Sequence, residues 1–111
     1  MIEIPLSAYP DQKLQIDLGG QMCTLRVYER SGFMYLDLTL GRTLLASGLL
    51  CQPTTPVLAP PPSGFSGNFC VIDTLAASES SQESPEFSGW GTRYKLYWLS
   101  PDDIADMSEA S

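Results

Sequence analysis

FMYLDLTL, residues 33–40, decides the fold because its side chains alternate without a break between apolar and polar. Successive side chains of a strand point to opposite faces of a sheet, so this period predicts a strand with one buried face. The apolar positions form the predicted buried row: Met34, Leu36, Leu38 and Leu40.

The segments around residues 33–40 predict further strands joined by tight turns. Gly19-Gly20 supplies residues suited to the positive φ of a hairpin turn, and Gly41-Arg42 makes another turn. The strand that follows is interrupted at Ser47-Gly48, where we expect a bulge or bend. The predicted strands follow one another as a meander and cover residues 14–18, 23–28, 33–40 and 43–51.

The second half of the chain alternates loops with shorter strands. Closely spaced prolines in residues 52–67 exclude a regular central strand and predict an extended loop or sheet edge. A Pro-rich run is also a ligand for aromatic-lined domains, but in a small domain it is more often a rigid connection. Two further strands are expected at residues 69–73 and 92–99, with an acidic Ser-rich loop between them at residues 76–89. Residues 101–111 are expected to form an acidic flexible tail, with a frayed amphipathic turn at residues 102–107 as the alternative.

These segments predict an all-β fold. With 111 residues and 43% apolar content, the chain fits one globular domain with a real core. We expect a small single-domain antiparallel β-sandwich or partly open barrel of about six or seven short strands. Residues 1–100 form this domain, and residues 101–111 form the tail.

The acidic residues are unevenly placed. The chain has 6 basic and 13 acidic residues, a net charge of −7, and all the bases lie in predicted strands or turns where acids match them. The acids that exceed the bases either lie in solvated, flexible segments or face a polyanion such as DNA and repel it. They lie in two segments without a base: Glu79, Glu83 and Glu86 in the Ser-rich loop, and Asp102, Asp103, Asp106 and Glu109 in the tail.

Residues for catalysis and metal binding are scarce. Without histidine, neither a Ser/His/Asp nor a Cys/His nucleophilic arrangement is available from this chain. Cys23, Cys51 and Cys70 are widely spaced and odd in number, which favours buried thiols over disulfides or a zinc site. Asp17 and Asp37 are a formal carboxylate pair, but nothing indicates that either is buried. We therefore expect that the protein is not an enzyme, and we predict no catalytic, cofactor-binding or metal-binding residue.

Membrane and nucleic-acid partners are not expected either. No apolar run approaches the roughly 20 residues that cross a bilayer, and the first residues lack the features of a secretory signal, so synthesis in the cytosol is expected. Tyr28, Phe33 and Tyr35 offer rings on which bases would stack, but the accompanying basic groove is missing. Specific nucleic-acid binding is therefore not expected.

The strand segments keep a particular order and spacing along residues 2–99. They are residues 2–6, 14–25, 30–38, 45–49, 69–73 and 91–99, with Pro61-Pro62-Ser63-Gly64 before the fifth. In this order the chain resembles the small baseplate plug proteins of contractile-tailed phages. Their middle strand reads aromatic-Tyr-Leu-Asp, which is similar to Met34-Tyr35-Leu36-Asp37 with the aromatic displaced to Phe33.

The resemblance implies a structural virion protein at the centre of the tail baseplate, assembled in the host cytoplasm. It would pack with the hub, the spike and the tail tube or neighbouring baseplate proteins, with copies of itself in a ring. It would close or line the central tail channel before genome ejection. The acidic residues Glu79, Glu83, Glu86, Asp102, Asp103 and Asp106 would then face the lumen and repel DNA.

Partner contacts are expected through large aromatic side chains and exposed strand edges. The candidate interface residues are Phe33, Tyr35, Trp90 and Tyr97, which would otherwise cover the domain's own loops. Lys13 and the proline run would protect the sheet edges, or a neighbouring subunit would add its own strand there.

A second function class stays open. An acidic soluble inhibitor or DNA mimic would bind a basic nucleic-acid-binding protein through carboxylates held on a rigid face. The surplus acids argue against mimicry because they lie in predicted flexible, serine-spaced segments.

Overall fold

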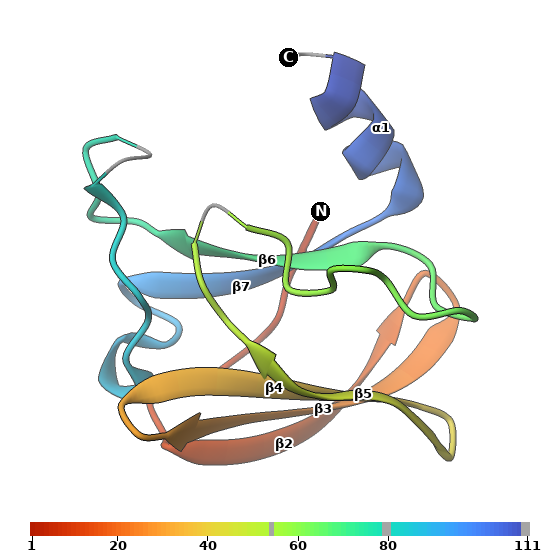
Figure 1. Ribbon diagram of the computed structural model, residues 1–111, viewed down its shortest axis with the longest axis horizontal. Helices are drawn as coiled ribbons and strands as arrows, with labels where there is room; N and C mark the ends of the chain where they lie inside the picture. The colour runs from red at the N-terminus through yellow and green to blue at the C-terminus, as the bar shows by residue number, and fades with distance from the viewer. Residues whose placement is uncertain (54, 79–80, 110–111) are drawn as a thin grey trace.

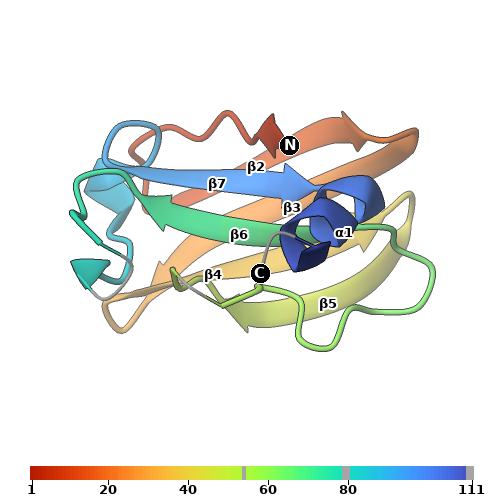
Figure 2. The ribbon, with the colours of Figure 1, turned by 90° about the horizontal axis from the view of Figure 1, so that it is seen from above.

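The computed structural model describes residues 1–53, 55–78 and 81–109, which form two stacked antiparallel sheets and a short helix (Figure 1). The larger sheet has the strand order β2 (Asp11–Leu18), β3 (Gln21–Arg30), β4 (Phe33–Leu40) and β5 (Thr43–Leu50). The smaller sheet has the order β1 (Ile2–Glu3), β7 (Tyr94–Leu99) and β6 (Asn68–Asp73). Seen from above, β6 and β7 lie over the larger sheet (Figure 2), which confirms the predicted all-β sandwich, and among the described residues no closed barrel forms.

The larger sheet is the predicted meander, in which each strand pairs with the next along the chain. The β2–β3 hairpin closes with Leu18 opposite Gln21, and its turn residues Gly19 and Gly20 have φ of 63° and 85°. Residues with a branched Cβ rarely adopt such φ values, whereas glycine adopts them without steric cost. The turn chemistry therefore fixes the register that places the apolar rows of β2 and β3 on the same face.

The predicted irregularity at Ser47-Gly48 is present in β5. The pairing with β4 shifts register between Leu36 and Leu38 and again between Leu38 and Thr39, as a β-bulge does. Gly48 has a φ of 65°, and its N–H donates to Asp37 Oδ1 at 2.7 Å. A side chain of β4 thus replaces a ladder hydrogen bond that the bulge removes.

The core fills the space between the sheets and is closed at its margins by loop residues. The larger sheet contributes mostly aliphatic side chains, whereas the smaller sheet contributes both aromatic and aliphatic ones. Burial of these apolar side chains is the main favourable contribution to folding. Members with at most 2% of their surface exposed are Ile4, Leu18, Cys23, Leu25, Val27, Met34, Leu36, Leu38, Cys51, Leu58, Phe69, Val71, Trp90 and Leu96.

The proline-rich loop runs along the outer edge of β6. Pro53 bridges to Val71, and the N–H of Val57 donates to the carbonyl of Phe69 at 3.0 Å. The Asn68 side chain joins the same loop, accepting from Leu58 N and donating to Leu58 O, both at 2.9 Å. The loop therefore occupies a sheet edge, as the prolines predict, and covers the edge that β6 would otherwise expose.

The segment after β7 differs from the predicted flexible tail, because helix α1 covers Pro101–Glu109. Ser100 and Asp103 form a reciprocal cap: Asp103 N–H donates to Ser100 Oγ at 3.1 Å, and Ser100 N–H donates to Asp103 Oδ2 at 3.0 Å. Proline at the first helical position and acids in the first turn also favour a helix start. Figure 1 shows α1 projecting from the body of the sandwich.

Candidate assembly surface

The outer face of the larger sheet carries a pair of stacked tyrosines. Tyr28 of β3 and Tyr35 of β4 lie opposite each other in the register, with ring centroids 6.0 Å apart and an interplanar angle of 28°. Directly opposed aromatic residues on neighbouring strands are a favourable cross-strand pair. The stack therefore holds Tyr35 in place on this face.

Charged groups hold Tyr28 in its position. Its hydroxyl donates to Asp37 Oδ1 at 3.0 Å, and the guanidinium carbons of Arg26 and Arg30 lie 4.5 Å and 5.7 Å from its ring centroid. Burial, then the hydrogen bond to Asp37, raises the pKa of Tyr28, so the ring stays neutral and donates. Arg26 also makes a two-point contact with Asp11, at 3.1 Å and 2.7 Å, and this hydrogen bonding lowers the pKa of Asp11.

Exposed apolar side chains flank this ordered group. Phe33 lies two residues before Tyr35 on the same strand face and is 43% exposed, and Leu50 lies opposite Tyr35 on β5 and is 41% exposed. We call Phe33, Tyr35 and Leu50 the aromatic patch. Its exposed side chains are apolar, and its ring at Tyr35 is held by Tyr28, so a protein partner would order this ring at low entropic cost.

The other predicted interface residues lie elsewhere. Tyr97 is half-buried and pairs with Glu3 and Cys70 in the smaller sheet, so it lies in the opposite layer from Tyr35. Trp90 is only 2% exposed and belongs to the core, so it covers the domain's own interior and is not a surface residue. Its indole N–H has no hydrogen-bond partner among the described residues. The predicted residues therefore do not form one continuous surface.

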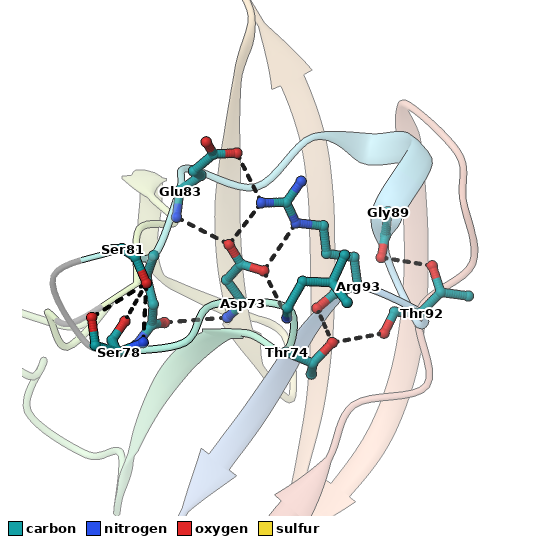
Figure 3. A network of polar contacts seen from close by, with 10 residues as sticks. Asp73, Thr74, Ser78, Ser81, Glu83, Gly89, Thr92 and Arg93 are labelled. Carbon is teal, nitrogen blue, oxygen red and sulfur yellow. Dashed lines mark hydrogen bonds and ion pairs between the residues drawn. The ribbon is translucent and has the colours of Figure 1, made fainter.

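A second polar group ties the acidic loop to the smaller sheet (Figure 3). The side chain of Asp73 is fully buried and accepts two hydrogen bonds from Arg93, each at 2.9 Å. It also accepts from the backbone N–H groups of Leu75 and Glu83, each at 3.1 Å. These bonds, the Arg93 bonds above all, hold the pKa of Asp73 well below its ordinary range. The start of the loop is thereby fixed to the end of β6.

The acids predicted to face a lumen are only partly free of cationic partners. Glu83 accepts from Arg93 at 2.8 Å, and Asp103 lies 2.7 Å from the N-terminal ammonium. The hydrogen bond from the N-terminal ammonium, and then the one from the Ser100 N–H, lowers the pKa of Asp103. Glu86, Asp102 and Asp106 are exposed, whereas Glu79 lies outside the described residues. Neither acidic segment contains a base, but Glu83 and Asp103 pair with cations from elsewhere in the chain. The orientation of the acids toward a lumen stays a prediction.

The remaining chemical groups are separate from one another. Asp17 accepts from the N–H of Gly20 in a turn, and Asp37 bonds Tyr28 and Gly48, with strand β3 between the two carboxylates. In residues 1–53, 55–78 and 81–109, no three His, Cys, Asp or Glu side chains gather where they could hold a metal ion. Within the same residues, no helix has the length and apolar character needed to cross a membrane.

The cysteines are free, as the sequence predicts, but not all are fully buried. Cys23 and Cys51 lie in the core, whereas Cys70 is half-buried on the outer side of β6. Burial raises the pKa of Cys51 to about 12 and also raises that of Cys23 and Cys70. The thiols are therefore protonated near neutral pH and serve as small apolar side chains.

A shallow hollow of about 460 Å³ lies on the same outer sheet face as the tyrosines. Its lining is mostly polar and holds one charged side chain: Lys13, Leu14, Gln15, Thr24, Thr39 and Gly41. Small-molecule sites are usually deep and mostly apolar, with convergent polar groups. The hollow lacks these features of a small-molecule site. This face is therefore better suited to contact with a protein than to binding a small molecule.

Comparison with known proteins identifies the family of the chain. The family model for the cyanophage baseplate Pam3 plug gp18 matches residues 1–102. No curated protein matches the chain. The chain belongs to this family of phage baseplate plugs, which confirms the resemblance drawn from the strand order.

Proposed function

We propose that this member of the baseplate plug family packs with the hub and spike proteins and closes or lines the central tail channel before genome ejection. Family membership makes the protein a structural part of the phage tail baseplate. The aromatic patch is the observation that supports partner packing. Phe33 and Leu50 are exposed, and the half-buried Tyr35 is already fixed by Tyr28, so a partner gains apolar burial with little ordering cost.

The partners of the patch are neighbouring baseplate proteins, assembled with this chain in the host cytoplasm. Copies of the chain in a ring around the tail axis would place the same patch against each neighbour. The exposed acids Glu86, Asp102 and Asp106 would point into the channel and repel DNA that passes through it.

Particle incorporation tests the packing role. The double variant Phe33→Ala/Tyr35→Ala removes the patch from the outer face of the larger sheet. Aromatic residues that are hot spots of an interface contribute about 2 kcal/mol or more, so incorporation should fall roughly tenfold or more. Tyr9→Ala is the matched control, because Tyr9 is an exposed aromatic (62%) outside the patch. Unfolding in urea checks that both variants fold.

Two results would contradict the proposal. Unchanged incorporation of the double variant would remove the patch as the contact surface. Electron cryomicroscopy of intact tails gives the second test: density for this chain on the tail axis is expected, with the acidic segments toward the lumen. Absence from the particle would remove the plug role and favour the soluble acidic inhibitor.

A further inference from the structure

Strand β5 is an exposed sheet edge without the usual protection. It pairs with β4 on one side, and no other described strand lies along its second side. None of its residues is charged: it reads TLLASGLL, residues 43–50. Leu44 and Leu50 are 59% and 41% exposed on this strand. An exposed apolar edge is a template for pairing with another strand.

The other edges of the two sheets are protected. Strand β2 presents the exposed charged side chains of Asp11, Lys13 and Asp17. The proline-rich loop covers β6 through Pro53 and Val57, and β1 has only two residues, one of them Glu3. Charges, prolines and short length are the devices by which proteins prevent edge pairing. Strand β5 has only the bulge at its centre.

We propose that β5 pairs antiparallel with β5 of a second copy of this chain, about a two-fold axis at Ser47. Pairing about this centre places Leu44 opposite Leu50 of the second copy and Leu45 opposite Leu49. The bulge lies at the axis, so the ladder hydrogen bonds form on either side of it, between residues 43–45 of one copy and 49–51 of the other.

Charge favours a second copy as the occupant of this edge. The chain has a net charge of −7, so most contacts between copies bring carboxylates together. Like charges directly opposite each other on paired strands are destabilising. Two β5 strands meet without any charged side chain and bury Leu44 and Leu50 of both copies. The pairing is also self-complementary, as a two-fold contact requires.

The paired edge would join the two aromatic patches. Leu50 belongs both to β5 and to the patch, so the patches of the two copies lie on one continuous sheet face. A two-fold contact closes at two copies, and any larger ring must use a second surface. The inference does not depend on the proposed function, because it concerns the isolated chain in solution.

Opposite charges at Ser47 test both the pairing and its centre. Ser47 is exposed, and each copy places it against its own symmetry mate. We expect the unmodified chain to sediment as a dimer at micromolar concentration, and Ser47→Lys and Ser47→Glu each to weaken self-association at least tenfold. An equimolar mixture of the two variants should dimerise again. The N–H of Cys51 already donates to the carbonyl of Met34 within one copy, so the alternate residues Leu44 and Leu50 point their N–H groups to the free edge. The amides of Leu44 and Leu50 should therefore exchange hydrogen slowly only in the dimeric samples.

Matched variants on the opposite edge provide the control. Gln15→Lys and Gln15→Glu make the same charge changes at an exposed position of β2 and should leave dimerisation unchanged. A monomeric unmodified chain would overturn self-pairing, even if β5 then bound a strand of a different baseplate protein. The pairing about Ser47 would be overturned if both Ser47 variants dimerised as strongly as the unmodified chain. It would also be overturned if the equimolar mixture of Ser47→Lys and Ser47→Glu stayed monomeric.

Discussion

Gly67 lies where two parts of the sandwich meet, and we predict that Gly67→Ala destabilises the fold strongly. Its φ is 97°, a backbone conformation that residues other than glycine rarely adopt. A Cβ atom built there would meet the carbonyl oxygen of Leu99 and lie 2.6 Å from the indole nitrogen of Trp98. That indole donates to the carbonyl of the neighbouring Ser66 at 3.2 Å, so it has little freedom to move.

The expected loss is the sum of a conformational cost and a packing cost. A left-handed conformation costs an ordinary L-residue about 1 to 2 kcal/mol. Forcing an extra methyl group into a filled site costs about 1 to 3 kcal/mol more. Together these give a loss of about 2 to 5 kcal/mol in the free energy of unfolding.

Gly64→Ala separates the two costs. Gly64 has a φ of 88°, but no atom lies within 4 Å of the Cβ that alanine would add, so only the conformational cost applies. Urea unfolding followed by tryptophan fluorescence measures both variants. With a slope of roughly 1 to 3 kcal/mol per molar urea, the midpoint of Gly67→Ala should fall by about 1 M or more. Equal midpoints for the two variants would refute the packing argument.

Two further predictions concern titratable groups. Because hydrogen bonds from Arg93 hold the pKa of Asp73 below its ordinary 3.8, this carboxylate stabilises the fold fully above about pH 4 and loses that contribution as pH falls through its depressed pKa. Asp73→Asn should therefore lower the urea midpoint at pH 7 and reduce its decline in acid; an equally steep decline in the variant would contradict this role. For the thiols, native protein treated with iodoacetamide at neutral pH should be modified at half-buried Cys70 before Cys23 or Cys51, as peptide mass spectrometry would show. Modification of Cys51 first would contradict the buried placement.

The larger sheet could be predicted from sequence because its signals are local. Alternation fixes which side chains of residues 33–40 face the core, and Gly19-Gly20 fixes the first hairpin. The irregularity at Ser47-Gly48 was also readable, since glycine inside an apolar strand favours a bulge. Helix α1 had a local signal too, Ser100-Pro101-Asp102-Asp103, which combines a cap, a helix-start proline and first-turn acids.

The candidate surface was harder to predict because it depends on contacts between distant residues. Alternation places Tyr28 on the outer face, but its burial comes from Arg26, Tyr35 and Asp37 on that face. Glu83 lies in a segment without a base, yet the guanidinium of Arg93 contacts both Asp73 and Glu83. Sequence gives no sign that one cation serves two carboxylates. Leu50 follows the bulge, where simple alternation no longer tells which face a residue takes.

The pairing of β1 with β7 has a consequence for the order of folding. Ile2 lies opposite Trp98, so the smaller sheet joins the first strand to the last, whereas the larger sheet is built from successive hairpins. Local hairpins form faster than pairings between distant segments, because closing a long loop costs more chain entropy. During synthesis the meander can therefore form while the ribosome still holds the last strand. Strand β1 can pair with β7 only after β7 leaves the ribosome.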